Sequence, residues 1–100
     1  MDAKKERYKR IRGAILKLLA YEHPRPVDSK VIHVLLDDLR YPITEEECQS
    51  HLAYLSEKGL VNKECRQGSG VRLEMITISP RGLDVLDGFG DPEPGVDVRF

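Results

Sequence analysis

The stretch LAYLSEKGLVNKECRQGSGVRLEMITISPRG, residues 52–82, decides the fold because its apolar residues change their spacing within it. Leu52 and Leu55 lie three residues apart, which is the spacing of an amphipathic helix. Gly59 follows them, and glycine commonly ends a helix because it adopts a positive φ without steric cost. The sequence therefore predicts a helix that ends at residue 59 and a different structure after it.

The residues after this glycine have the period of strands. Residues 61–66 and 72–78 are predicted to form two short strands, and the Gln-Gly-Ser-Gly tip at 67–70 joins them into a hairpin. Ser79 and Pro80 then begin another helix, because serine is a good N-cap and proline loses nothing at the first helical position. We expect this short helix to end near residue 88.

Three helices are expected before the hairpin. Residues 4–22 carry apolar side chains at helical spacing, and the prolines that follow end this helix. Residues 29–39 repeat the same spacing over a shorter stretch. Thr44 begins the third helix, and Glu47 three residues later completes a capping box. Two helices joined by a tight turn make a helix-turn-helix candidate.

The order helix, helix, helix, hairpin, helix places the chain in the α+β class. We expect one folded domain over residues 1–88, built from a three-helix core, a two-stranded hairpin and a short C-terminal helix. Residues 89–100 hold two prolines and two glycines, and we expect them to form an extended tail.

Two motifs resemble those of the winged helix-turn-helix domains of bacterial regulators. The third helix of that family commonly ends in Glu-Lys-Gly-Leu-Val, which stands here at 57–61. The last strand of its hairpin, the wing, commonly runs into Leu-Thr-x-x-Gly, matched here by Ile-Ser-Pro-Arg-Gly at 78–82. The resemblance covers residues 8–88, and the whole chain also resembles small winged-helix proteins of Mu-like prophages. It implies a DNA-binding transcription regulator that acts as a homodimer.

The resemblance also implies a set of contact residues. In such regulators the third helix enters the major groove and the wing contacts the backbone. The recognition helix, residues 44–58, is expected to contact double-stranded DNA through Thr44, Gln49, Ser50 and Tyr54. The wing and the basic first helix are expected to hold phosphates through Arg66, Ser69, Arg72, Lys9, Arg10 and Arg12. Arg66 and Arg72 flank the hairpin tip and are expected to lie beside each other across it.

Charge is divided unevenly along the chain, although the formal net charge is −1. Residues 1–12 hold six basic and two acidic side chains, a balance of +4, which suits a nucleic-acid face. Residues 28–58 hold seven acidic and three basic side chains, a balance of −4. Glu45 and Glu46 at the start of the recognition helix would oppose DNA phosphates. This conflict supports an alternative, a protein–protein interaction adaptor that keeps the fold without reading DNA, because an acidic helix suits a basic protein partner.

Other classes of function find little support in the sequence. Cys48, Cys65, His33 and His51 lack the close spacing of metal ligands, so no metal or cofactor is expected. Cys48 fits a core position better, and the two histidines are expected at the surface or on the capped side of their helices. No nucleophile and base share a motif, so an enzyme is not expected. A charged beginning and the lack of a long apolar run predict a cytoplasmic protein without a signal peptide or membrane span.

Two features predict contact with a partner chain. Leu16 lies outside the main apolar stripe of the first helix, so we expect an apolar surface there that serves dimerisation. Phe89, Val96, Val98 and Phe100 could pack on a partner, or the tail could be a frayed terminus.

Overall fold

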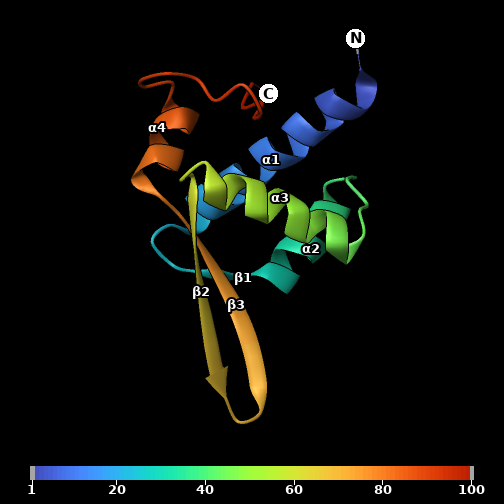
Figure 1. Cartoon of the computed structure of the whole chain (residues 1–100), viewed down its shortest axis with the longest axis vertical. Coiled ribbons are helices and arrows are strands. Elements are labelled where there is room, and N and C mark those ends of the chain that lie inside the picture. The colour runs from blue at the N-terminus through green and yellow to red at the C-terminus, as the bar shows by residue number, and fades with distance from the viewer. Residues whose placement is uncertain (1, 100) are drawn as a thin grey trace.

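The computed structural model describes residues 2–99 and has the winged-helix architecture that the sequence predicts (Figure 1). The elements follow in the order α1 (Ala3–Glu22), β1 (Val27–Asp28), α2 (Ser29–Asp38), α3 (Glu45–Glu57), β2 (Val61–Gly68), β3 (Val71–Ile78) and α4 (Pro80–Asp87). The helices gather at one end, and the β2–β3 hairpin, the wing, projects away from them along the long axis of a molecule that measures 46 × 27 × 21 Å.

The sheet has three antiparallel strands in the order β1-β3-β2. The two-residue strand β1 pairs with the base of β3, where Val27 lies opposite Ile76. Strands β2 and β3 pair over their whole length. Only Ser69 and Gly70 form the turn between them, and both have the positive φ, 53° and 76°, that two-residue hairpin turns favour. The strands are therefore longer, and the tip shorter, than predicted.

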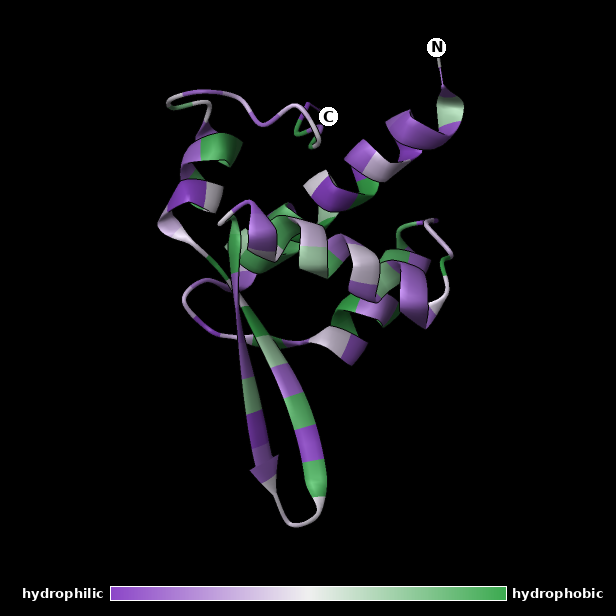
Figure 2. Cartoon of the chain, viewed as in Figure 1, coloured by the Kyte–Doolittle hydropathy of each residue, from purple (hydrophilic) through white to green (hydrophobic). Residues whose placement is uncertain are grey.

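The core lies where α1, α2 and α3 meet the base of the wing. Figure 2 shows apolar residues concentrated between the helices, while the wing alternates apolar and polar residues along β3. The buried apolar side chains are Ile11, Ala14, Ile15, Leu16, Leu19, Ile32, Leu36, Cys48, Leu52, Leu55, Leu60, Val61, Ile76, Ile78 and Val85. Cys48 is thus a core residue, as predicted.

The prediction of an apolar surface at Leu16 is wrong, because this side chain is fully buried. The physical reason is that α1 packs against α2, α3, α4 and β3, so several sides of this helix are covered instead of one. A single apolar stripe is typical of a helix that lies on the outside of a core. The part of α1 from Ile11 onward is instead surrounded by other elements, while its first turns project from the fold.

The start of α4 is tied to the end of α3. Gly59 has a φ of 73° and ends α3, as predicted, and its carbonyl accepts a hydrogen bond from the Ser79 hydroxyl. The Ser79 oxygen also caps α4 by accepting from the amide of Gly82 at 3.0 Å. A Cβ atom at Gly82 would overlap the carbonyl oxygen of Leu60 and lie 2.7 Å from Ile78 Cγ1. The glycine of the Ile-Ser-Pro-Arg-Gly motif is therefore required by a close approach between backbones.

The C-terminal segment, residues 89–99, folds back over the helices instead of fraying (Figure 1). Val96 and Val98 pack against the core, and the amide of Asp97 donates to the carbonyl of Lys9 at 3.0 Å. Phe89 remains 66% exposed. Phe100 lies outside the described residues, and the division of the chain at residue 88 stays a prediction.

We expect Gly82→Ala to lower the free energy of unfolding by about 1–3 kcal/mol, because the added methyl group meets backbone atoms that cannot move independently. Gly68→Ala is the matched control, since no heavy atom lies within 4 Å of its added Cβ. The control is expected to change stability by less than about 0.5 kcal/mol. Urea denaturation measures both variants, and equal losses would contradict the close approach at Gly82.

Candidate nucleic-acid interface

Helix α3 presents an open surface on the side that faces away from the core. Glu45, Glu46, Ser50 and Ala53 are exposed, and Gln49 is half-buried beside them. These five residues line one shallow hollow. Gln49 and Ser50 are thus accessible to a ligand that lies along α3, and their contact with DNA bases stays a prediction.

The acidic start of α3 is partly explained by the stability of the helix. The Thr44 hydroxyl accepts from the amide of Glu47 at 3.1 Å, and the Glu47 carboxylate accepts from the amide of Thr44 at 3.0 Å, which completes the predicted capping box. Hydrogen bonds from the backbone and then the side chain of Thr44 lower the pKa of Glu47. Glu45 and Glu46 have no such role in the cap and remain exposed.

Tyr54 follows Ser50 by one turn of α3, but the side chain of Tyr54 contacts the C-terminal segment. Its hydroxyl donates to Glu93 Oε1 at 3.2 Å, and the guanidinium carbon of Arg12 lies 3.8 Å from the centre of its ring. Two residues predicted to contact DNA, Tyr54 and Arg12, are therefore engaged with each other and with the C-terminal segment. Their contact with DNA stays a prediction.

The prediction that Arg66 and Arg72 lie beside each other is wrong. The register places Arg66 opposite Leu73 and Arg72 opposite Gln67, and residues paired across two strands share a face of the sheet. The two arginines therefore point to opposite faces of the wing. The reason is that the turn has two residues. Turn length sets the register of the two strands, and a shift of the register by one residue moves every side chain to the other face of the sheet.

The two faces of the wing have different surroundings. Arg72 shares its face with Ile76 and Ile78, which are buried in the core, so Arg72 lies on the side of the wing that faces the helices. Its Nη2 atom lies 3.9 Å from the sulfur of Cys65. Arg66 lies on the outer face, where its Nε contacts Glu64 Oε1 at 3.4 Å.

The basic part of α1 lies at the other end of the molecule from the wing tip with Ser69 (Figure 1). Lys9 is half-buried and pairs with Glu6 at 3.5 Å, whereas Arg10 is exposed. The structure therefore separates the two groups of predicted phosphate contacts along its 46 Å axis.

His51 is buried between α3 and α1, which corrects its predicted position at the surface or on the capped side of the helix. Its Nδ1 accepts from Arg12 Nε at 3.2 Å, and its ring meets that of Tyr8 edge to face at 5.1 Å. Burial, followed by the nearby charge of Arg12, lowers the pKa of His51 to about 4. His33 is half-buried, and its Nε2 lies 2.6 Å from the carbonyl oxygen of Ile43.

Two features are absent from residues 2–99. No group of three or more His, Cys, Asp or Glu side chains in this part of the chain is arranged to hold a metal ion. None of the helices in the same residues combines the length and apolar character needed to cross a membrane.

The comparisons with known proteins agree with this architecture. A family model described as the ribonuclease R winged-helix domain matches residues 13–86. Among solved structures, the chain is similar to a PadR family transcriptional regulator from Eggerthella lenta DSM 2243, with a TM-score of 0.62 and 20% sequence identity. The similarity covers 75% of this chain and 66% of that chain, slightly less than two thirds of its length. No curated protein matches the sequence significantly.

We expect the free energy of unfolding to fall as the pH drops from about 6.5 toward about 4. The unfolded chain protonates His51 near its ordinary pKa of 6.5, whereas the folded chain keeps it neutral down to about 4. This difference contributes roughly 3 kcal/mol that is present above pH 6.5 and lost by pH 4. His51→Gln should remove this part of the pH dependence, and His23→Gln, at an exposed histidine, should keep it. Urea denaturation across this range measures both, and identical pH profiles for wild type and His51→Gln would contradict the assignment.

Proposed function

The chain belongs to the family of ribonuclease R winged-helix domains, and on that premise we propose that it binds double-stranded DNA as a transcription regulator. The observation that supports this proposal is the combination of an open α3 surface with a projecting wing that carries Arg72 on its helix-facing side. A solved structure with the same fold is described as a transcriptional regulator.

In the proposed complex, α3 lies in the major groove, whose width of about 12 Å admits a helix. Gln49 can pair with adenine, and Ser50 can hydrogen-bond to several bases. Arg72 and the backbone amides around Ser69 would meet phosphates beside the wing. Lys9 and Arg10 lie at the other end of the 46 Å axis. Because a turn of DNA rises about 34 Å, these residues would hold a more distant part of the backbone.

We further propose that the chain is a regulator of prophage type, that it acts in the cytoplasm as a homodimer, and that it is not an enzyme. Dimers suit DNA sites with twofold symmetry. Because Leu16 is buried, a dimer needs a surface other than the one predicted on α1. Analytical ultracentrifugation at several protein concentrations measures the state of association.

We expect the affinity for a random-sequence duplex to fall as salt rises, with a linear log–log dependence. Arg72→Ala should reduce the slope by about 0.9, which corresponds to one phosphate contact. Arg66→Ala is the matched control, because it removes the same charge from the outer face of the wing, and it should reduce the slope less. Fluorescence anisotropy measures the slopes. A chain without salt-dependent binding would contradict the proposed function, and equal slopes for both variants would contradict the assigned face.

A second candidate function is a protein-interaction adaptor. The observation that favours it is the hollow between α2 and α3, which exposed Val34 and exposed Glu45 both line. An acidic surface with apolar side chains fits a basic protein partner.

The two candidate functions predict opposite effects for the double variant Glu45→Gln/Glu46→Gln. If α3 lies against DNA, removing two carboxylates from its exposed start should strengthen duplex binding. If the chain is an adaptor, the same change should abolish capture of the basic partner. Asp37→Asn/Asp38→Asn removes the same charge from the exposed end of α2 and is the control. Weaker DNA binding by the Gln variant would contradict the placement of α3 beside phosphates.

A further inference from the structure

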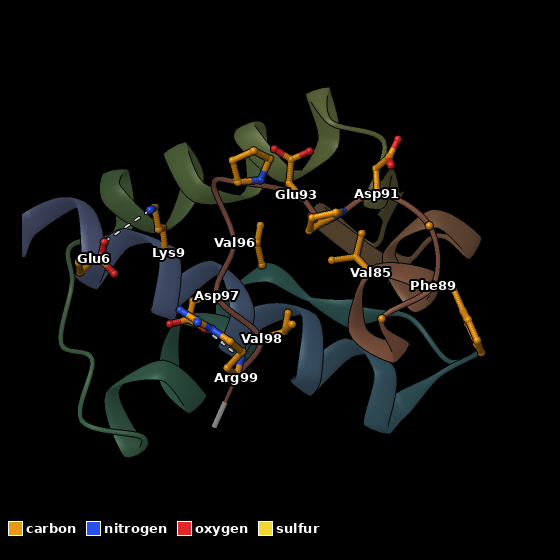
Figure 3. A pocket seen from close by; sticks show the side chains of 14 residues that line it. Glu6, Lys9, Val85, Phe89, Asp91, Glu93, Val96, Asp97, Val98 and Arg99 are labelled. Atoms are coloured by element: carbon orange, nitrogen blue, oxygen red, sulfur yellow. Dashed lines mark hydrogen bonds and ion pairs between the residues drawn. The ribbon is translucent and has the colours of Figure 1, made fainter.

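The C-terminal segment buries one carboxylate in a cluster of donors. Glu93 is only 7% exposed, and its oxygens face Tyr54, Lys58 and Arg81. The Tyr54 hydroxyl and Arg81 Nη2 each lie 3.2 Å from it, and Lys58 Nζ lies 3.9 Å away. Figure 3 shows the Glu93 side chain directed toward α3. A carboxylate is buried at low cost only when charges and hydrogen bonds of this kind compensate it.

Part of the arrangement of these donors comes from α3 and α4 and not from the C-terminal segment. Tyr54 and Lys58 are four residues apart at the end of α3, so they share one face of the helix. Arg81, on α4, is held in place because its Nε donates to the carbonyl of Lys58 at 3.2 Å. The side chains of Lys58 and Arg81 remain 46% and 48% exposed, so both cations are accessible beside the covered carboxylate.

The segment that carries Glu93 lies flat against this site. Arg12 Nη1 donates to the carbonyl of Gly95 at 3.2 Å, and a Cβ atom at Gly95 would overlap the Tyr54 hydroxyl. Beyond that point, Val96 and Val98 are only partly buried. Residues 89–99 contain no helix or strand. A segment without regular secondary structure, held by isolated hydrogen bonds and partly buried side chains, opens at a lower free energy than the whole fold.

We propose that Tyr54, Lys58 and Arg81 form a phosphate-binding site that Glu93 fills in this structure, and that the ligand of the open site is the nucleic-acid backbone. Carboxylate and phosphate oxygens accept the same charge-assisted hydrogen bonds from guanidinium and ammonium groups. The site lies on the flank of the proposed recognition surface, where a backbone strand borders the major groove. The C-terminal segment therefore competes with DNA. The site stands on its own geometry, and its nucleic-acid ligand rests on the proposed function.

The site itself is tested with pyrophosphate and without DNA. Glu93→Gln keeps the shape of the side chain and removes its charge, and Asp91→Asn removes the same charge from an exposed position in the same segment. NMR signals of Lys58 and Arg81 report the binding of pyrophosphate. The Glu93→Gln protein should bind it at least about tenfold more tightly than the wild-type or Asp91→Asn protein. Equal affinities in the three proteins overturn the site.

A second variant opens the site by another route. Gly95→Ala keeps Glu93 but lifts the segment from Tyr54, so it should give the same gain in pyrophosphate affinity. Thermal melting followed by circular dichroism shows which variants fold. If either variant is folded and binds pyrophosphate no more tightly than wild type, the proposed site is overturned. One folded variant is therefore enough for the test.

The ligand is tested with duplex DNA at several salt concentrations. Two additional phosphate contacts should make the log–log slope of Glu93→Gln steeper than that of wild type by up to about 1.8. Adding Lys58→Gln and Arg81→Gln should cancel this gain. A gain with pyrophosphate alone assigns the site to free phosphate and overturns the nucleic-acid ligand. If no variant binds DNA, the proposed function fails, and the pyrophosphate titration still decides the site.

Discussion

The wing is tied to the helices by one close contact, between the first turn of α4 and the residues that join α3 to β2. At this point the carbonyl of Leu60 accepts from the amide of Ser79 at 3.0 Å and lies so close to Gly82 that no side chain fits between them. Leu60, Val61 and Ile78 are buried around the same point. The helix that precedes the wing and the helix that follows it are therefore held at the base of one hairpin. These contacts fix the direction of the wing relative to the exposed surface of α3.

The number and order of the elements could be predicted because each is encoded locally. The period of apolar residues, the capping box at Thr44 and the glycine at residue 59 all act within a few residues of chain. The register of the wing could not be predicted in the same way, because it depends on whether the turn has two residues or four. That difference decided the relative direction of Arg66 and Arg72.

Side chains whose surroundings come from distant parts of the chain were predicted less accurately. Leu16 and His51 were expected at the surface because a single helix does not reveal how many neighbours surround it, and α1 has four. Tyr54 was expected to face outward, but it contacts Glu93, 39 residues away. The composition of the C-terminal segment indicates a loop, and no local pattern shows that Gly95 permits this loop to lie against an aromatic ring. Gln49 and Ser50, by contrast, depend only on the periodicity of α3.

The position of β2 at the edge of the sheet has a consequence for self-association. An edge strand of eight residues offers unpaired amides and carbonyls to the strands of other molecules. Here Val61 is buried in the fold, and the rest of the strand is Asn-Lys-Glu-Cys-Arg-Gln-Gly. Charged side chains of both signs, above all Lys63, disfavour the growth of a continuous sheet between molecules. The β2 edge of the long hairpin can therefore extend into solvent without providing a ready template for aggregation.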